Sequence, residues 1–92
     1  MKDLLLFYRD DCGYCHKAHR AMDELMEETP AYRELNITRI EETQQPELAD
    51  QYDYYAVPTF FMEGEKVFEA HIGMCYEAIK AEVKSVLEAA LQ

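Results

Sequence analysis

The chain has 92 residues and a formal net charge of −10, and 49% of its residues are hydrophobic. This length suits one domain, spanning residues 1–92, and the apolar fraction is typical of a globular core rather than a disordered chain. Such an acidic surface argues against nucleic acid or an anionic membrane as a main partner, because both would repel it.

The first half of the sequence predicts two strands and two helices. The apolar run Leu4–Tyr8 indicates a buried strand, and apolar residues recur at helical spacing from Gly13 to about Glu28. Residues 35–40 are expected to form a second strand. Pro46 then suits the first position of a short helix.

The second half predicts a hairpin followed by a helix. Strands are expected at Ala56–Met62 and Lys66–Ile72, joined by a turn at residues 63–66. A helical stripe then runs from about Met74 to Leu91. The expected order is β-α-β-α-β-β-α, with a parallel first pair of strands and an antiparallel last pair. The fold class is therefore α/β, with a four-stranded mixed sheet flanked by three helices.

The three cysteines and the first residues bear on where the protein works. Cys12 and Cys15 form one close pair and Cys75 stands apart, which is not the pattern of a disulfide framework. The first apolar run is too short for a signal peptide, and no run approaches the roughly 20 residues of a membrane helix. We expect a cytoplasmic protein.

The segment DCGYCH, residues 11–16, fits three chemistries. C-x-x-C is the spacing of a thiol–disulfide redox pair, and C-x-x-C-H is also the attachment signature of a c-type haem. With His19 added, the same residues could form part of a metal site. The position of the segment, after a predicted strand and at the start of a helix, favours the redox pair. Unpaired N–H groups and the helix dipole would stabilise a thiolate on Cys12, and Cys15 would lie one turn behind it.

The alternatives have specific weaknesses. Haem attachment needs an exported chain and room for a large ring, and neither is expected here. A zinc site built from Cys12, Cys15 and His19 lacks a fourth ligand nearby. A non-catalytic module that uses the same cysteines, such as an iron–sulfur cluster carrier, stays open as an alternative function.

On the segments FYRDDCGYC, AVPTFF and HIG, the chain resembles the small glutaredoxin- and thioredoxin-like proteins of the thioredoxin-fold superfamily. The resemblance covers nearly the whole chain. It implies a thioredoxin fold and a thiol–disulfide oxidoreductase that reduces protein or small-molecule disulfides. It also implies a cis peptide bond before Pro58, with that proline lying against the catalytic pair, Cys12 and Cys15.

The resemblance is divided between the two families. Arg9 stands where glutaredoxins carry a basic residue that helps to hold glutathione, whereas the second half is closer to thioredoxins. Gly73 stands alone where glutaredoxins have two glycines, and Leu6 replaces the buried aspartate of thioredoxins. The electron donor is therefore expected to be a thioredoxin-reductase-like protein or, less efficiently, glutathione. No other cofactor and no metal are expected, and the protein is expected to be a monomer. The residues expected to contact substrate are Arg9, Tyr14, Val57, Pro58 and Gly73.

Four further side chains carry expectations that a structure can test. Cys75 is expected to be a semi-buried thiol at the start of the last helix, because free cysteines are commonly buried. Tyr52 is expected in the core on helical spacing. Either Tyr54 or Tyr55 is expected to line a partner groove, because aromatic side chains are enriched at recognition surfaces.

Overall fold

A computed structural model describes residues 1–92 and confirms the predicted order of elements, with one added turn of 3-10 helix. The elements are β1 (Leu4–Tyr8), α1 (Gly13–Glu28), η1 (Pro30–Glu34), β2 (Ile37–Glu41), α2 (Pro46–Ala49), β3 (Thr59–Met62), β4 (Glu65–Glu69) and α3 (Tyr76–Leu91). The extra element, η1, follows Pro30, the residue expected to end the first long helix.

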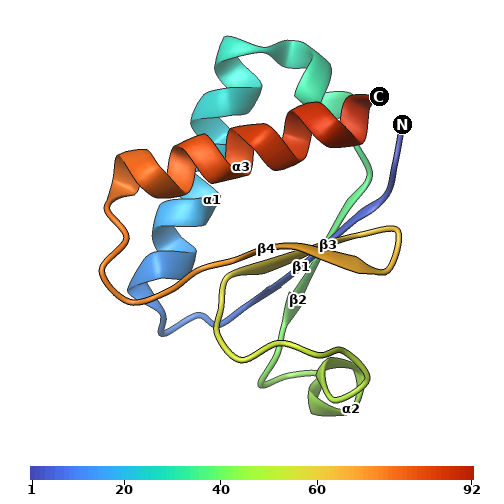
Figure 1. The fold of residues 1–92 in the computed structure, drawn as a ribbon, viewed down its shortest axis with the longest axis vertical. Coiled ribbons are helices and arrows are strands. Elements are labelled where there is room, and N and C mark those ends of the chain that lie inside the picture. Colours follow the sequence, from blue (N-terminus) through green and yellow to red (C-terminus); the bar gives the residue numbers. More distant parts are fainter.

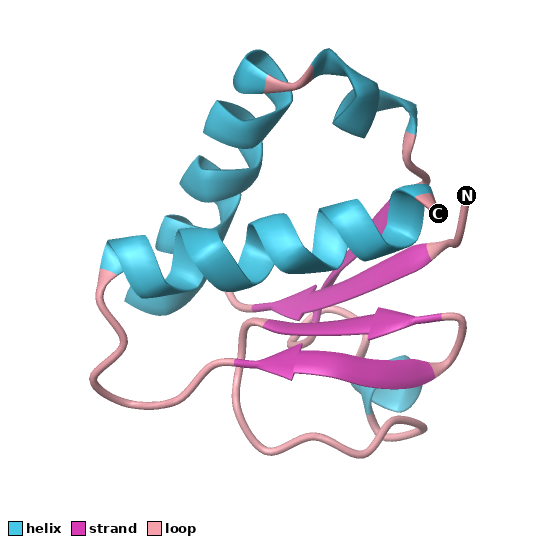
Figure 2. Ribbon diagram, turned by 45° about the horizontal axis from the view of Figure 1, so that its top comes forward, coloured by secondary structure: helices cyan, strands magenta, loops and turns pink.

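The four strands form one mixed sheet in the order β2-β1-β3-β4. β1 pairs with β2 in parallel, while β3 is antiparallel to both β1 and β4. Helices α1 and α3 cover one face of the sheet, and α2 lies on the opposite side (Figures 1 and 2). This α/β arrangement is the one that the sequence pattern predicts, and it is the thioredoxin fold that the resemblance implies.

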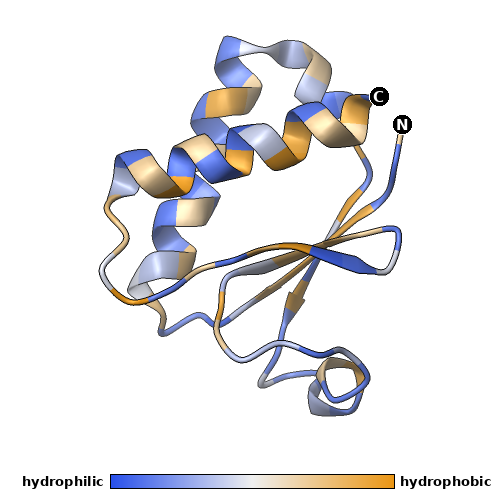
Figure 3. Cartoon of the chain, in the orientation of Figure 1, coloured by the Kyte–Doolittle hydropathy of each residue, from blue (hydrophilic) through white to orange (hydrophobic).

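Alternation along β1 divides the core into two parts. Leu4 and Leu6 point to the side of α1 and α3 and join a cluster of 17 buried residues, whereas Phe7 faces α2. Apolar segments line the strands and alternate with polar ones along α3 (Figure 3). Burying one such leucine or phenylalanine stabilises the fold by about 1.5–3 kcal/mol, so the large cluster is the main support of the sheet and of the start of α1.

The hairpin turn is confirmed, but both of its strands are shorter than expected. β3 begins at Thr59 rather than Ala56, and β4 ends at Glu69 rather than Ile72. The paired residues Thr59 and Glu69 mark the end of the regular ladder. The next residue on β3's side is Pro58, which has no N–H to donate. Only one further bond forms, from the Ala70 amide to the Pro58 carbonyl at 3.0 Å.

The last helix begins at Tyr76, two residues later than expected, with Cys75 as its N-cap. Gly73 has a φ of 95°, a conformation that favours glycine, and it turns the chain before the helix starts. Met74 is buried, whereas Cys75 is exposed. The expectation of a semi-buried Cys75 is therefore wrong, because Cys75 precedes the helix as its N-cap and lies at the surface.

The two ends of the chain lie close together (Figure 1), and the Lys2 amide donates to the Ala90 carbonyl at 2.7 Å. None of the helices combines the length and the apolar character needed to span a membrane.

Candidate active site

Cys12 and Cys15 lie at the start of α1, just after the loop that connects it to β1. Cys12 is the N-cap of the helix, with an extended backbone, and its sulfur accepts a hydrogen bond from the Cys15 amide at 3.2 Å. Its carbonyl accepts from the His16 amide at 3.1 Å. The sulfur thus satisfies one of the N–H groups that a helix start leaves unpaired. The arrangement that the sequence predicts for the C-x-x-C segment is present.

The two thiols differ in exposure. Cys12 is half-buried, whereas Cys15 is only 1% exposed and packs in the interior. Burial raises the pKa of the Cys15 thiol well above its ordinary value, and its hydrogen bond with Cys12 adds to the shift. Cys15 is therefore a protonated thiol at neutral pH, and Cys12 is the sulfur that a large molecule can reach.

A loop distant in sequence closes over Cys12. The Val57–Pro58 peptide bond is cis, and Pro58 is buried. The Cys12 thiol donates to the Val57 carbonyl with 3.7 Å between sulfur and oxygen. The structure thus places the Val57 carbonyl, at the peptide bond before Pro58, beside Cys12.

This loop is held in place by the Glu69 carboxylate at the end of β4. One of its oxygens accepts from the amides of Tyr55 and Ala56, at 2.5 and 2.7 Å. Burial alone would raise the pKa of Glu69, but hydrogen bonds from Lys66 and from the two amides lower it on balance. The charged Glu69 carboxylate therefore holds in place the backbone of Tyr55 and Ala56, which leads to Pro58.

Arg9 lies next to the pair in sequence, but its guanidinium has intramolecular partners. It makes two hydrogen bonds of 3.1 Å to the Asp11 carboxylate and lies 3.9 Å from Glu42. Its side chain remains 44% exposed. Any carboxylate of an incoming ligand would therefore compete with Asp11 for this cation.

Tyr14 connects the start of α1 to the turn before α3. Its hydroxyl accepts a hydrogen bond from the Gly73 amide at 2.8 Å, across 59 positions of sequence. Lys17 lies over its ring at 5.4 Å. Two of the predicted substrate-contacting residues thus touch each other, and their contact fixes one side of the surface around Cys12.

The candidate zinc ligands do not converge. His19 packs its ring edge-on against Tyr8, with 4.7 Å between centroids, and its Nδ1 lies 3.0 Å from the Arg39 guanidinium. The chain holds no group of three or more His, Cys, Asp or Glu side chains arranged to bind a metal ion. Cys12, Cys15 and His19 therefore do not form the metal site that their spacing allows.

Two glutamates beside the pair were not predicted as site residues. Glu41 is buried at the end of β2 and accepts hydrogen bonds from the Asp10 and Thr43 amides, at 3.0 and 2.6 Å. The Thr43 hydroxyl bond, followed by the Asp10 amide bond, lowers the pKa of Glu41. The parallel register places Glu41 opposite Tyr8. Parallel strands end at the same edge of a sheet. The place of Glu41 at the end of the second predicted strand was therefore the signal available in the sequence.

Glu42, the next residue, accepts a hydrogen bond from the Tyr54 hydroxyl at 2.6 Å. Tyr54 stacks on Phe7 with 4.8 Å between ring centroids, and Tyr52 is only half-buried against the same ring. Tyr55 is 89% exposed. Tyr54 and Tyr55 both line a groove, together with Tyr52, which borders the core rather than filling it.

No cavity of the structure is lined by either redox cysteine. The Cys12 sulfur instead opens onto a surface bordered by the Val57 loop. Such a surface suits contact with an extended segment of another molecule better than enclosure of a small one.

A thioredoxin family model matches residues 2–85 of the chain. Among solved structures, the chain is similar to a mutant thioredoxin from Halobacterium salinarum NRC-1, at 27% identity and a TM-score of 0.62, with 99% of this chain and 75% of that chain covered. It is also similar to thioredoxin from Malassezia sympodialis, at 18% identity and a TM-score of 0.69, over 99% and 78% of the two chains.

Thioredoxin 1 from Thermosipho africanus is similar over nearly the full length of both chains. Its identity is 14% and its TM-score 0.59, with 98% of this chain and 99% of that chain covered. No curated protein sequence matches the chain. The match over residues 2–85, together with these structures, shows that the chain belongs to the thioredoxin family and is a thioredoxin-like redox protein.

Proposed function

We propose that the protein is a thiol–disulfide oxidoreductase that reduces disulfides of other proteins through Cys12 and Cys15. The observation that carries this proposal is the unequal exposure of the pair. Cys12 is half-buried at the start of a helix, and Cys15 is buried directly behind it. A two-step exchange requires an attacking sulfur that a substrate can reach, with a resolving sulfur buried behind it.

In the first step, the Cys12 thiolate attacks one sulfur of the substrate disulfide. A bond forms between Cys12 and that sulfur, the substrate S–S bond breaks, and the other substrate sulfur leaves as a thiolate that takes a proton. The Cys15 amide, 3.2 Å from the Cys12 sulfur, supports the negative charge before attack.

In the second step, Cys15 loses its proton and attacks the Cys12 sulfur. A Cys12–Cys15 disulfide forms, and the substrate leaves as a dithiol after its second sulfur takes a proton. Two electrons have moved from the pair to the substrate. Because burial keeps Cys15 protonated at neutral pH, it does not compete with Cys12 for the first attack.

The surface beside Cys12 supports protein substrates. The Val57 carbonyl lies 3.7 Å from the Cys12 sulfur, at the edge where an extended segment can pair as an added strand. We assign substrate contact to Val57 and Pro58, and indirect support of this surface to Tyr14 and Gly73.

The oxidised pair needs an electron donor, and we propose a thioredoxin-reductase-like protein in the cytoplasm. Glutathione is the weaker candidate. Arg9, the residue expected to hold its carboxylate, is already engaged by Asp11 at 3.1 Å. We propose that the protein acts as a monomer.

Two assays test this function. In a single-turnover assay, the pre-reduced protein is mixed with an excess of insulin, and the expected result is about one disulfide reduced per protein. In a coupled assay, oxidation of NADPH is followed with either thioredoxin reductase or glutathione and its reductase, and the first donor is expected to be faster. Absence of any insulin reduction would refute the proposed function, whereas faster glutathione coupling would refute only the donor.

A further inference from the structure

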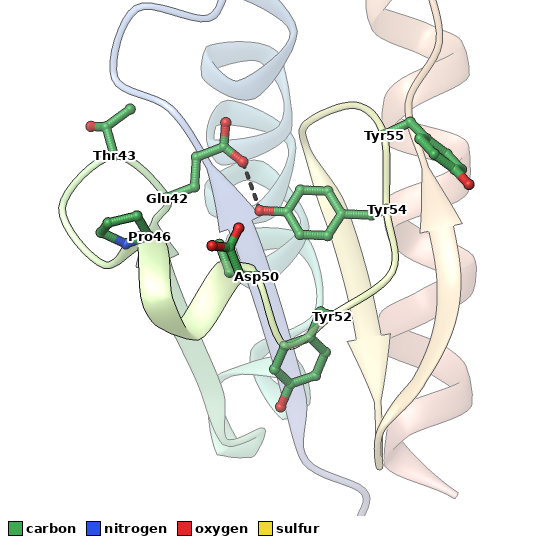
Figure 4. Close-up of a pocket in the computed structure, with 8 residues that line it drawn as sticks. Glu42, Thr43, Pro46, Asp50, Tyr52, Tyr54 and Tyr55 are labelled. Atoms are coloured by element: carbon green, nitrogen blue, oxygen red, sulfur yellow. Dashed lines mark hydrogen bonds between the residues drawn. The ribbon is translucent and has the colours of Figure 1, made fainter.

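A cavity of about 480 Å³ lies on the side of α2, next to the loop that leads to Val57 and Pro58. Figure 4 shows it between the end of β2, helix α2 and the loop that leads to Pro58. The eight residues around it are Glu42, Thr43, Pro46, Ala49, Asp50, Tyr52, Tyr54 and Tyr55. We call it the Tyr54 pocket.

The Tyr54 pocket carries two negative charges and no positive one. Glu42 and Asp50 line it, and no lysine, arginine or histidine does. Two cations lie near its edge: Arg9 is 3.9 Å from Glu42 but makes its two 3.1 Å hydrogen bonds to Asp11, and Lys66 lies 5.7 Å over the Tyr55 ring but pairs with Glu69 at 2.8 Å. The partner of Glu42 inside the pocket is the neutral hydroxyl of Tyr54. The Asp50 carboxylate is exposed and takes part in no ion pair or hydrogen bond of the chain.

Tyr54 gives the pocket a rigid aromatic wall. Its ring stacks on Phe7 with an interplanar angle of 17°, and its hydroxyl is fixed by Glu42 at 2.6 Å. Aromatic faces attract cations, and the methylene groups of a long basic side chain pack well on apolar surface such as Pro46 and Ala49. Tyr55 does not take part, because its ring is turned away from the two carboxylates (Figure 4).

The pocket lies within reach of a substrate bound at Cys12. Tyr54 precedes Val57 by three residues, and the Val57 carbonyl touches the Cys12 sulfur at 3.7 Å. An extended segment paired along this loop advances about 3.3 Å per residue. A side chain about three residues from the target cysteine would therefore lie roughly 10 Å along the loop, beside Tyr54.

We propose that the Tyr54 pocket binds a lysine or arginine side chain that lies about three residues from the target cysteine of a protein disulfide. This inference rests on the proposed function and names its substrate class: proteins with a basic residue close to the reducible cysteine. The net charge of −10 adds long-range attraction for such substrates.

The test uses short peptides with one cysteine, carried as a mixed disulfide with the neutral thiol mercaptoethanol. One peptide has lysine three residues from the cysteine, and a matched peptide has glutamine there; the same pair is made on the other side of the cysteine. The pre-reduced protein is mixed with each peptide at low salt, and the second-order rate constant of reduction is measured. The comparison is repeated for Asp50→Asn and Glu42→Gln. Glu82→Gln, which makes the same change of charge on α3, on the opposite face of the sheet, is the control.

The lysine peptide is expected to react about two- to fivefold faster than its glutamine partner on one side of the cysteine, the range for an exposed ion pair. The Asp50→Asn and Glu42→Gln variants should bring this ratio close to one, while Glu82→Gln should keep it. Asp50 is exposed, so its variant folds even if that of Glu42 does not. Equal rates for the two peptides, or an equal loss of preference in Glu82→Gln, would overturn the pocket and leave the proposed function intact. Failure to reduce any peptide would overturn both.

Discussion

The thiol of Cys12 and the carbonyl of Val57 face each other across 45 positions of sequence, with 3.7 Å between sulfur and oxygen. This contact joins the start of α1 to the loop before β3. A sulfur atom bound covalently to Cys12 would therefore lie beside a backbone edge that can pair with an extended chain. Under the proposed function, the reaction at Cys12 and the binding of a substrate segment therefore take place at one point of the surface.

Alkylation should distinguish the two cysteines of the pair. In a Cys75→Ser background, which removes the exposed third thiol, iodoacetamide at about pH 7 should label Cys12 and leave Cys15 unmodified. Burial raises the pKa of Cys15 and also blocks access to it. Peptide mass spectrometry of the reduced protein over a time course checks this order. Labelling of Cys15 before Cys12 would contradict the assigned roles.

The hydrogen bond between Tyr14 and Gly73 should make a measurable contribution to the free energy of unfolding. Tyr14→Phe removes the hydroxyl that accepts from the Gly73 amide at 2.8 Å. We expect a loss of about 0.5–1.5 kcal/mol in the free energy of unfolding, the usual net value of one hydrogen bond. The Gly73 amide should also exchange faster with solvent, as followed by NMR.

Tyr55→Phe is the matched control, because the Tyr55 side chain is 89% exposed and its hydroxyl makes no hydrogen bond. It should change neither the free energy of unfolding nor the exchange of Gly73. Unchanged exchange in Tyr14→Phe would mean that the turn before α3 is held by other contacts.

Glu41 should make the protein sensitive to acid. Hydrogen bonds from Thr43 and from the Asp10 amide lower its pKa in the folded state below the ordinary value of 4.5. The unfolded chain then binds the proton more readily than the folded chain does. This stabilisation is therefore present above about pH 4.5 and is lost as the pH falls through the folded-state pKa.

Urea unfolding from about pH 7 down to pH 3 measures this effect. Glu41→Gln places an N–H group where an oxygen accepts from the Asp10 amide. It should be less stable than the parent at neutral pH and should lose stability less steeply below about pH 4.5. Glu82→Gln, at an exposed position on α3, should keep the parent's slope. A Glu41→Gln curve parallel to that of the parent would contradict this role.

The spacing of apolar residues along the chain was sufficient to predict the order of the strands and helices. The bounds of β1 and α1 agree with the structure, because Leu4–Tyr8 is a compact apolar run and Pro30 closes the helical pattern. The two strands of the hairpin are shorter than predicted because Pro58 ends the ladder early, an effect of one missing N–H that apolar content does not reveal. The position of Cys75 was wrong for a similarly local reason: Gly73 delays the start of α3.

The site was predictable where it depends on sequence-local geometry. C-x-x-C at a helix start predicted the place of Cys12 at the N-cap, and the resemblance pointed to the Val57–Pro58 loop, whose Val57 carbonyl contacts Cys12. Tyr54 was expected only as one of two tyrosines that could line a groove, and Glu42 was not predicted at all, because their contact at 2.6 Å depends on how two loops meet. The pairing of Arg9 with Asp11 likewise depends on the side-chain conformations within a loop, which the sequence does not give.

Trapping of mixed disulfides tests the central claim most directly, namely that Cys12 attacks the substrate and Cys15 resolves the intermediate. Cys15→Ser and Cys12→Ser, both in the Cys75→Ser background, are incubated with a protein that contains one disulfide and analysed by non-reducing electrophoresis. Cys15→Ser should accumulate a covalent complex through Cys12 that a reducing agent releases, and Cys12→Ser should accumulate none. A complex formed by Cys12→Ser, or by neither variant, would contradict the proposed exchange.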